Sequence, residues 1–416
     1  MYVAARGGEA AIQNAEQLYH ELNGSVTLNT VRMIERSLPY LVDRVMGEGS
    51  LYAPELAALA LAQSGGDVYE AVLMVRAYRS TQPRLTYAQP ITPHNMLIVR
   101  RISAAFKDIP GGQILGPTLD YSHRILRLEV LEEEEGTATA DDDQRPIDED
   151  RPLPIDDEQT SMSNRQSSVV DLESPTPNSL QALANYGQFP LVADWQREAG
   201  LLDHIEHPDT LDPADIPDVT REPLLFPASR AHRLQSLSRA ETGGVLALGY
   251  ANMRGYGSVH PTINEVRLAY ADVMMTHPIT GESFSAGRVR MSQAEVVTTL
   301  KGSAENPRLA LGFCATLGWN EVKTIAGSML DMAMDLPEPH PSHTEEYVLY
   351  HTDPVESSGF CIHYKLPHYV TFGSSLDAMR AVKYMAPAQD TKNGYYGEAG
   401  NLATTTPGTY AEKELA

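Results

Sequence analysis

The sequence predicts an α+β fold in which a mainly helical N-terminal region precedes a domain of mixed strands and helices, with a disordered acidic insert between them. Apolar residues recur at helical spacing near the N-terminus, short apolar runs typical of strands follow about residue 221, and the centre has few large apolar residues. At 416 residues the chain is long enough for two domains. The predicted regions are 1–131 for the helical region, 132–178 for the insert, 179–386 for the α+β domain and 387–416 for a polar tail.

The N-terminal region is predicted to form four helices, because stretches rich in Gly, Ser and Asn separate segments with helical periodicity. Thr27 is expected to cap the second helix. Farther along, Ile109–Gly116 is expected to be a loop that turns at Pro110, and Tyr121–Leu131 a strand that leads into the insert. The four predicted helices are Ala10–Leu22, Leu28–Val45, Ala53–Gln63 and Val68–Tyr78.

The central insert is strongly acidic. Between Glu132 and Glu173 there are 15 acidic and 3 basic residues, together with prolines and serines. Such a composition buries too little apolar surface to offset the entropy of ordering the chain, so we expect a disordered insertion. An acidic docking segment for a basic partner is the alternative interpretation.

The region after about residue 221 mixes both kinds of periodicity, which indicates strands and helices in one domain. Helices are expected at Gln293–Lys301 and Asn320–Asp335. The expected strands are Gly244–Tyr250, Val266–Met274, Ser285–Met291 and Tyr347–Thr352.

Composition excludes several classes of partner and cofactor. Lys+Arg number 32 against Asp+Glu 55, a net charge of −23, which argues against nucleic acid or an anionic membrane as the main partner. No apolar stretch approaches the roughly 18 residues that a membrane span requires. The two cysteines are too few for a four-iron cluster, so no iron-sulfur cluster is expected in this chain. The N-terminus has no apolar signal segment, which favours a cytoplasmic location.

His363 and His368 flank Pro367 and indicate half of a metal site, because neutral imidazole is the commonest ligand for zinc-like metals. The expected local structure is a strand, a tight turn at the proline and a second strand from about Tyr369. Two histidines do not complete a zinc site. A partner chain could complete it, and hydrogen-bonded histidines at strand ends are the alternative without a metal. Further candidate ligands in this chain are Cys361, on the same face of the expected strand as His363, and the nearby His351, Asp353 and Glu356.

Residues 221–301 hold nine basic and six acidic residues in an otherwise acidic chain, and eight of the nine are arginine. Arginine binds phosphate bidentately, and glycines allow the backbone to approach an anion closely. The segment is therefore a candidate for phosphate binding, although turn glycines with surface or ion-paired arginines would give the same pattern. The candidate residues are Arg239, Arg254, Gly255 and Gly257.

Asp331 and Asp335 are the candidate catalytic pair. They lie four residues apart and share one face of a predicted helix, where two carboxylates can divide acid and base roles. A solvated helix face is the alternative explanation. The chain lacks a nucleotide-binding P-loop and the dinucleotide pattern, which excludes the usual kinases and motor ATPases.

Four blocks of sequence resemble the PhnI family, the I subunit of the bacterial carbon-phosphorus lyase core complex. The resemblance spans roughly residues 1–130 and 180–385, and the acidic insert and long tail depart from it. The blocks are Met46–Tyr52, Arg100–Gln113, Gly249–Gly257 continuing through His260–Thr262, and His363–Val370.

This resemblance implies an enzymatic role for the chain. The family's complex displaces adenine from ATP by an alkylphosphonate to give ribose 1-phosphonate 5-triphosphate, and this subunit alone would act as a purine nucleosidase on ATP or GTP. The resemblance also implies other core subunits as partners, including the radical S-adenosylmethionine subunit, where the dihistidine metal would lie at the interface. A non-catalytic scaffold subunit and a stand-alone zinc hydrolase are the competing interpretations.

Overall fold

The computed structural model describes residues 8–92, 95–131, 189–204, 216–256, 260–303, 306–365 and 369–385. The predictions for the insert and the polar tail lie outside the described residues. Residues 6–360 form one compact unit, and the residues from Cys361 onward belong to a second, which is described separately.

The N-terminal region is helical, as expected. Its helices are α1 (Gly8–Asn23), α2 (Leu28–Ser37), α3 (Pro39–Gly49), α4 (Pro54–Gln63) and α5 (Val68–Ser80). Thr27 caps α2 by accepting a hydrogen bond from the backbone N–H of Thr30. One predicted helix is two, because Pro39 lacks the N–H that a continuous helix needs and instead opens α3. Helices α2 to α5 share a core built around buried Val42, Met46 and Leu61.

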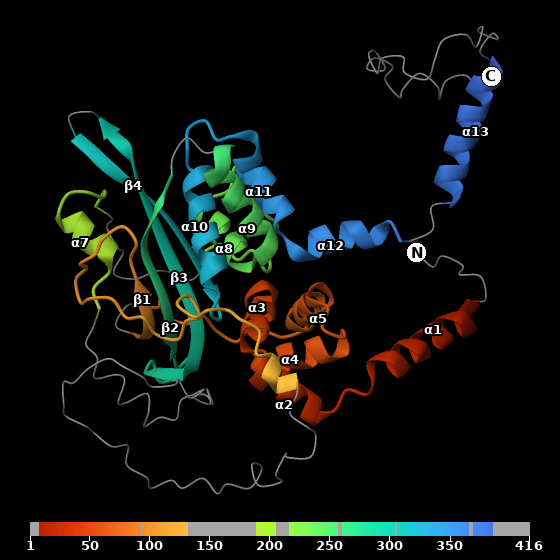
Figure 1. Ribbon diagram of the computed structural model, residues 1–416, viewed down its shortest axis with the longest axis horizontal. Helices are drawn as coiled ribbons and strands as arrows, with labels where there is room; N and C mark the ends of the chain where they lie inside the picture. Colours follow the sequence, from red (N-terminus) through yellow and green to blue (C-terminus); the bar gives the residue numbers. More distant parts are fainter. Residues whose placement is uncertain are drawn as a thin grey trace, which may run out of the picture. The chain divides into compact units, whose positions relative to one another are not determined.

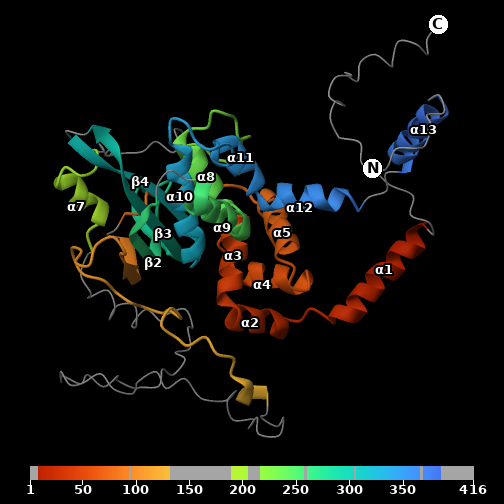
Figure 2. The same ribbon diagram turned by 45° about the horizontal axis from the view of Figure 1, so that its top comes forward.

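A four-stranded antiparallel sheet of order β1-β2-β3-β4 forms the second part of this unit (Figure 1). Its strands are β1 (Met96–Ile102), β2 (Thr262–Thr276), β3 (Ser283–Ser303) and β4 (Asn306–Leu317). Helix α10 (Glu321–Met334) packs across β3 and β4, and with α8 (Arg230–Arg239) and α9 (Thr242–Ala251) it covers one face of the sheet (Figure 2). The short α7 (Val192–Glu198) contacts β2.

The contact between α10 and the sheet depends on glycine. A Cβ at Gly312 on β4 would lie 2.0 Å from the carbonyl oxygen of Ser328 on α10, so only glycine allows the helix to approach this closely. Met329, Met332 and Val296 fill the space beside this contact. The close approach holds the middle of α10 against β4, and the N-terminal end of the same helix carries buried polar residues described below.

The structure confirms several expected elements and overturns others. Val266–Met274 lies in β2, Ser285–Met291 lies in β3, and Asn320–Asp335 corresponds to α10 with its two caps. The helix predicted at Gln293–Lys301 is wrong, because these residues continue β3, where consecutive β-branched residues favour the strand.

Two predicted strands are helices. Gly244–Tyr250 lies in α9, whose first turn is capped by the side chain of Glu241. Tyr347–Thr352 overlaps α11 (Glu345–His351), capped by the hydroxyl of Thr344. Both runs are short and apolar, a pattern that does not separate strands from buried helices.

The predicted strand at Tyr121–Leu131 is also wrong, since these residues are exposed and only Leu128–Leu131 are regular, as a 3-10 helix. The expected turn at Pro110 is present, with the N–H of Gly112 donating to the carbonyl of Ile109. Strand β1, which the periodicity did not predict, pairs with β2.

The two strands expected on either side of Pro367 are wrong, because helix α12 (Pro354–His363) ends at His363 and α13 (Tyr369–Met385) begins at Tyr369. The turn expected at Pro367 itself lies outside the described residues. Across the part of the chain that the structure describes, no helix is both long and apolar enough to span a bilayer.

Candidate functional site

Helix α3 carries charged side chains into the interior between the helical layer and the sheet. Its Asp43 and Glu48 are almost completely buried, and α3 contacts α4 and α5 on one side and α8 and β4 on the other. Buried carboxylates require partners, and those of α3 come from the far side of this interface. The name polar junction is used below for the cluster Arg44, Glu48, Glu241, Thr242, Asn320 and Lys323.

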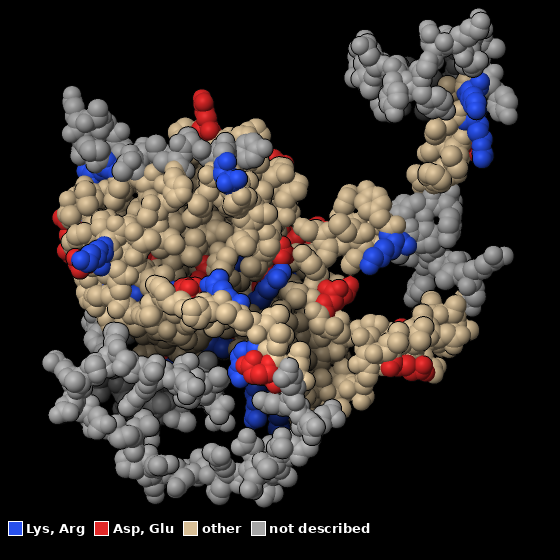
Figure 3. All heavy atoms as spheres, in the orientation of Figure 1, with Lys and Arg blue, Asp and Glu red and all other residues tan. Residues whose placement is uncertain are grey.

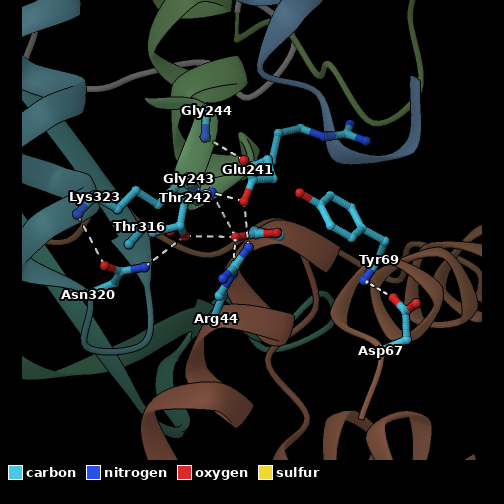
Figure 4. Close-up of polar contacts among 12 residues, drawn as sticks. Arg44, Asp67, Tyr69, Glu241, Thr242, Gly243, Gly244, Thr316, Asn320 and Lys323 are labelled. Atoms are coloured by element: carbon cyan, nitrogen blue, oxygen red, sulfur yellow. Dashed lines mark hydrogen bonds and ion pairs between the residues drawn. The ribbon is translucent and has the colours of Figure 1, made fainter. Parts of the chain in front are cut away.

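The N-terminus of α9 lies in the polar junction, and two carboxylates fill it (Figure 4). Glu241 accepts hydrogen bonds from the N–H groups of Gly243, at 2.8 Å, and of Gly244. Glu48 accepts from the N–H of Thr242 at 2.9 Å and from its hydroxyl at 2.7 Å. The positive end of the helix dipole is therefore already neutralised, and these amides are not available to a phosphate.

Arg44 holds the two carboxylates together. Its Nε donates to Glu48 at 2.9 Å and its Nη2 to Glu241 at 2.5 Å, so one guanidinium bridges α3 and the start of α9. The second carboxylate oxygen of Glu48 is buried and has no hydrogen-bond partner in the described part of the chain. Figure 4 shows the ring of Tyr69 pointing toward this cluster from α5, and burial followed by the charge of Glu241 raises the pKa of its hydroxyl.

Lys323 closes the other side of the polar junction. Its ammonium group is buried and donates to the carbonyl of Ser238 at 2.5 Å. Burial lowers the pKa of Lys323 to about 8, against an ordinary value of 10.5. Asn320 caps α10 and also donates to the hydroxyl of Thr242 at 3.0 Å, which links Asn320 through Thr242 to Glu48.

The predicted phosphate residues lie apart from one another. Arg239 ends α8, is half-buried, and donates to the carbonyl of Val219 at 2.9 Å. Arg254 lies beyond α9 in a π-helical turn, Asn252–Tyr256, where it is exposed and stacks over the ring of Tyr250 at 5.9 Å. The backbone of Gly255 belongs to the same turn, and Gly257 lies outside the described residues.

The candidate catalytic aspartates have structural partners. Asp331 is completely buried, accepts from the N–H of Phe313 at 2.9 Å, and forms a two-point ion pair with Arg230. Asp335 pairs with Arg233 at 3.1 Å. The two aspartates do share a face of α10, and the two arginines on α8 account for that arrangement.

The histidine pair is described only in part. His363 is exposed at the end of α12, and His368 lies outside the described residues. Cys361 is exposed too, but on a helix it lies about 200° around from His363 and not on the same face. Of the nearby candidates, His351 bonds the carbonyl of Tyr347.

No group of three His, Cys, Asp or Glu side chains that could hold a metal occurs among the residues that the structure describes. Asp353, another candidate ligand, is bound by Arg76 through both carboxylate oxygens, at 3.1 and 2.9 Å.

The block Arg100–Gln113 contributes Arg101 to a second buried charge cluster, the sheet network of Arg101, Glu265, Arg267 and Glu295. Arg101 donates to the carbonyls of Pro110, Gly112 and Pro190 at 2.6 to 2.8 Å and also to Glu265. Each of the three bonds to carbonyls fastens a loop to the sheet. The sequence block therefore positions the chain around β1 and β2.

Sequence reasoning missed Glu48, Arg44 and Lys323. Glu48 lies within the block Met46–Tyr52, and the family resemblance of that block is the one signal that could have indicated it. Nothing local indicates that its partner is Thr242, 194 residues farther along.

Comparisons with known proteins match nearly the whole chain. The family model of PhnI, a bacterial phosphonate metabolism protein, matches residues 1–386. The chain is 43% identical over 405 residues to the putative C-P lyase subunit protein HtxH of Stutzerimonas stutzeri, covering 94% of this chain and 99% of that protein. It is 36% identical to two PhnI subunits of alpha-D-ribose 1-methylphosphonate 5-triphosphate synthase. The one from Rhizobium meliloti (strain 1021) aligns over 392 residues, 92% of this chain and 95% of that protein, and the one from Escherichia coli (strain K12) over 394 residues, 92% and 98%.

Proposed function

The chain belongs to the PhnI family of bacterial phosphonate metabolism proteins, and on this premise we propose that it is a subunit of a carbon-phosphorus lyase core complex. Its partners would be the other core subunits, including the radical S-adenosylmethionine subunit, in the cytoplasm. The observation that carries the proposal is that two relatives, each aligned with 92% of this chain, are named as subunits of alpha-D-ribose 1-methylphosphonate 5-triphosphate synthase.

The proposed reaction exchanges the base of ATP for an alkylphosphonate. An oxygen of the phosphonate bonds to C1′, the C1′–N9 bond breaks, and its electron pair leaves with the purine, which takes up a proton and departs as adenine. The 5′-triphosphate is unchanged. When the chain is alone, water replaces the phosphonate and the reaction is hydrolysis of ATP or GTP at the glycosidic bond.

Such a reaction passes through an oxocarbenium-like centre and needs a clamp for the triphosphate. Arginines are concentrated where α5 and α8 meet, which suits a polyanionic substrate. Asp331 and Asp335 are held by Arg230 and Arg233, which favours positioning of α8 against α10 over proton transfer.

The test is chromatography of ATP incubated with the purified chain. Free adenine is expected from the chain alone, and adenine together with a phosphonate-bearing ribose triphosphate when companion subunits and methylphosphonate are added. Absence of adenine under both conditions would indicate a scaffold subunit. Hydrolysis that stops on chelation and needs no companion would indicate a zinc hydrolase.

We also propose that His363 and His368 bind zinc or a similar divalent metal together with ligands from a partner subunit. The described residues contribute only His363 and no third ligand near it, so tight binding requires the complex. His363→Ala and His368→Ala should each lower the metal content of the assembled complex by elemental analysis, because loss of a ligand exceeds the roughly 10- to 100-fold effect of changes beyond the ligands. His351→Ala is the matched control and should keep full metal content. Retention of the metal by both ligand variants would reduce these histidines to ordinary hydrogen-bonding residues.

A further inference from the structure

Four arginines from three parts of the chain gather beside the polar junction. Arg76 and Arg79 lie one turn apart on α5, Arg84 follows that helix, and Arg239 ends α8. Two aspartates lie among them: Asp353 pairs with Arg76 and Asp218 pairs with Arg84. Four guanidinium groups therefore share two carboxylates. The set Arg76, Arg79, Arg84 and Arg239 is called the arginine cluster below.

Only one member of the arginine cluster, Arg76, has a partner for every nitrogen, and Arg84 contacts Asp218 and Thr220 through Nη2 alone among the described residues. Arg76 donates to the carbonyls of Glu48 and Arg239 as well as to Asp353, so every nitrogen has a partner. The guanidinium of Arg79 makes no hydrogen bond within the described part of the chain. The Nε atoms of Arg79 and Arg239 are shielded from water and unpaired. An unpaired buried donor costs free energy that a ligand oxygen would recover.

The pKa values of Arg79 and Arg239 are both lowered, as expected for guanidinium groups that lack partners for some of their nitrogens. Burial lowers the pKa of Arg239 to about 10, with further lowering by the charges of Arg76 and Arg79. Burial also lowers the pKa of Arg79, the charge of Asp218 raises it, and the charges of Arg76 and Arg84 lower it. At Arg239 the repulsion by Arg76 and Arg79 exceeds the compensation by Asp353 and Asp218, and a bound anion would oppose that repulsion.

We propose that Arg79 and Arg239 form an oxyanion-binding site that takes a polyphosphate, which in the proposed reaction is the 5′-triphosphate of the substrate. This identification rests on the proposed function, whereas the anion site does not. Guanidinium groups match phosphate oxygens in geometry and charge. Both residues are partly exposed, and Figure 3 shows basic side chains gathered near the middle of one face, along the seam between α3 and α5 and the helices α8 and α9.

The competing anion sites fit less well. The N-terminal amides of α9 are filled by Glu48 and Glu241. Arg254 is exposed and lies beyond the far end of α9, a helix of 10 residues that starts three positions after Arg239. Arg267 also has unpaired nitrogens, but only 2% of the residue is exposed, so a ligand has no route to it.

The experiment measures the affinity of the full-length chain for inorganic tripolyphosphate by isothermal titration calorimetry at low salt. Arg79→Gln and Arg239→Gln should each weaken binding about 10-fold or more, the effect expected from losing one charge-assisted contact. Arg36→Gln, which removes one exposed positive charge from α2, is the matched control and should change the affinity less than about 2-fold.

The side chain of Arg79 makes no hydrogen bond or ion pair among the described residues, so Arg79→Gln should fold normally. It remains a sufficient test if Arg239→Gln, which loses its bond to the carbonyl of Val219, does not fold. Tripolyphosphate affinity that is unchanged in Arg79→Gln, or equally reduced in Arg36→Gln, would overturn the proposal.

A second measurement separates this site from the proposed function. In adenine release, Arg79→Gln should raise KM for ATP while leaving the reaction of adenosine unchanged, because adenosine has no phosphate. If the wild-type chain released no adenine yet bound tripolyphosphate through Arg79, the anion site would stand and the proposed function would fail.

Discussion

The sheet network and the arginine cluster contain the same kinds of residue in opposite states. In the sheet network two arginines face two glutamates. Arg101 is completely buried, and its nitrogens donate hydrogen bonds to backbone carbonyls and to Glu265. In the arginine cluster four arginines face two aspartates, and Arg79 and Arg239 keep unpaired nitrogens at partly exposed positions. Arg267 of the sheet network also keeps unpaired nitrogens, but the residue is only 2% exposed. A buried set of charges with equal numbers of each sign fastens the fold together, whereas a partly exposed set with excess charge of one sign has room for a ligand.

The polar junction lies between these extremes. Glu48 and Glu241 occupy the positive end of α9 in the way that an anion would, and Arg44 bridges them. The protein's own carboxylates thus complete a site that glycines at 243 and 244 leave open. A ligand for this part of the chain is accordingly expected at the adjacent arginine cluster.

The largest expected effect is in the sheet network. Arg101→Met would remove four hydrogen bonds and leave Glu265 with only Arg267, at 2.7 Å, as its charged partner. Breaking a buried ion pair from one side costs about 3–5 kcal/mol, a large share of the 5–15 kcal/mol typical of a domain. Urea denaturation measures the loss.

Arg127→Met is the matched control, because Arg127 and Glu129 form an exposed pair, with side chains 75% and 64% accessible. Its cost should stay below about 0.5 kcal/mol. Similar losses in the two variants would show that burial does not distinguish these arginines.

The next largest effect is a pH dependence that comes from Glu295. Burial, followed by the charge of Glu265, raises the pKa of Glu295 to about 7 from an ordinary value of 4.5. Because the folded pKa is higher, the folded state binds more protons between these values. The stability contribution is therefore fully present below pH 4.5 and is lost as the pH rises through 7, by about 3 kcal/mol in total.

Glu295→Gln should remove this dependence while keeping the acceptor for Asn264, whose amide lies 3.0 Å away. Urea midpoints at pH 5 and pH 7.5 measure the difference, and the wild type should weaken over this interval more than the variant. Parallel pH profiles would mean that Glu295 titrates normally.

The same comparison explains what the sequence could predict. Sequence pattern identified β2 at Val266–Met274 and α10 at Asn320–Asp335, because both are long apolar segments and α10 begins at a polar cap, Asn320. It failed for α9, whose first turn is capped by Glu241. Glu241 is held in turn by Arg44, which lies 197 positions earlier in the chain. It also failed at Gln293–Lys301, where the β-branched residues favour a strand that pairs with β2 and β4.

For the proposed anion site, the sequence could indicate a residue type, arginine, but not which arginines come together in the fold. The arginine excess of 221–301 led to Arg239, one of the two residues now assigned to the anion site. Arg79 could not be found this way, because α5 has the pattern of an ordinary amphipathic helix. Only the folded chain brings α5 near the end of α8, where Arg76 donates to the carbonyl of Arg239 at 3.1 Å. Asp331 and Asp335 were correctly placed on one face, and their partners Arg230 and Arg233 belong to a different helix.

The smallest expected effect concerns Arg79 in the absence of ligand. Arg79→Gln removes an unpaired, partly buried cation that Arg76 and Arg84 repel, so it should raise the stability of the ligand-free chain slightly, by about 0–1 kcal/mol at low salt. Arg84→Gln, which loses the ion pair with Asp218 at 2.7 Å, is the matched comparison and should not stabilise the chain. Thermal unfolding measures both. Added tripolyphosphate should then reverse the order, because a ligand that binds only the folded state stabilises the wild type and not Arg79→Gln. A stability loss of about 2 kcal/mol or more in ligand-free Arg79→Gln would place Arg79 with Arg101 among the residues that hold the fold together.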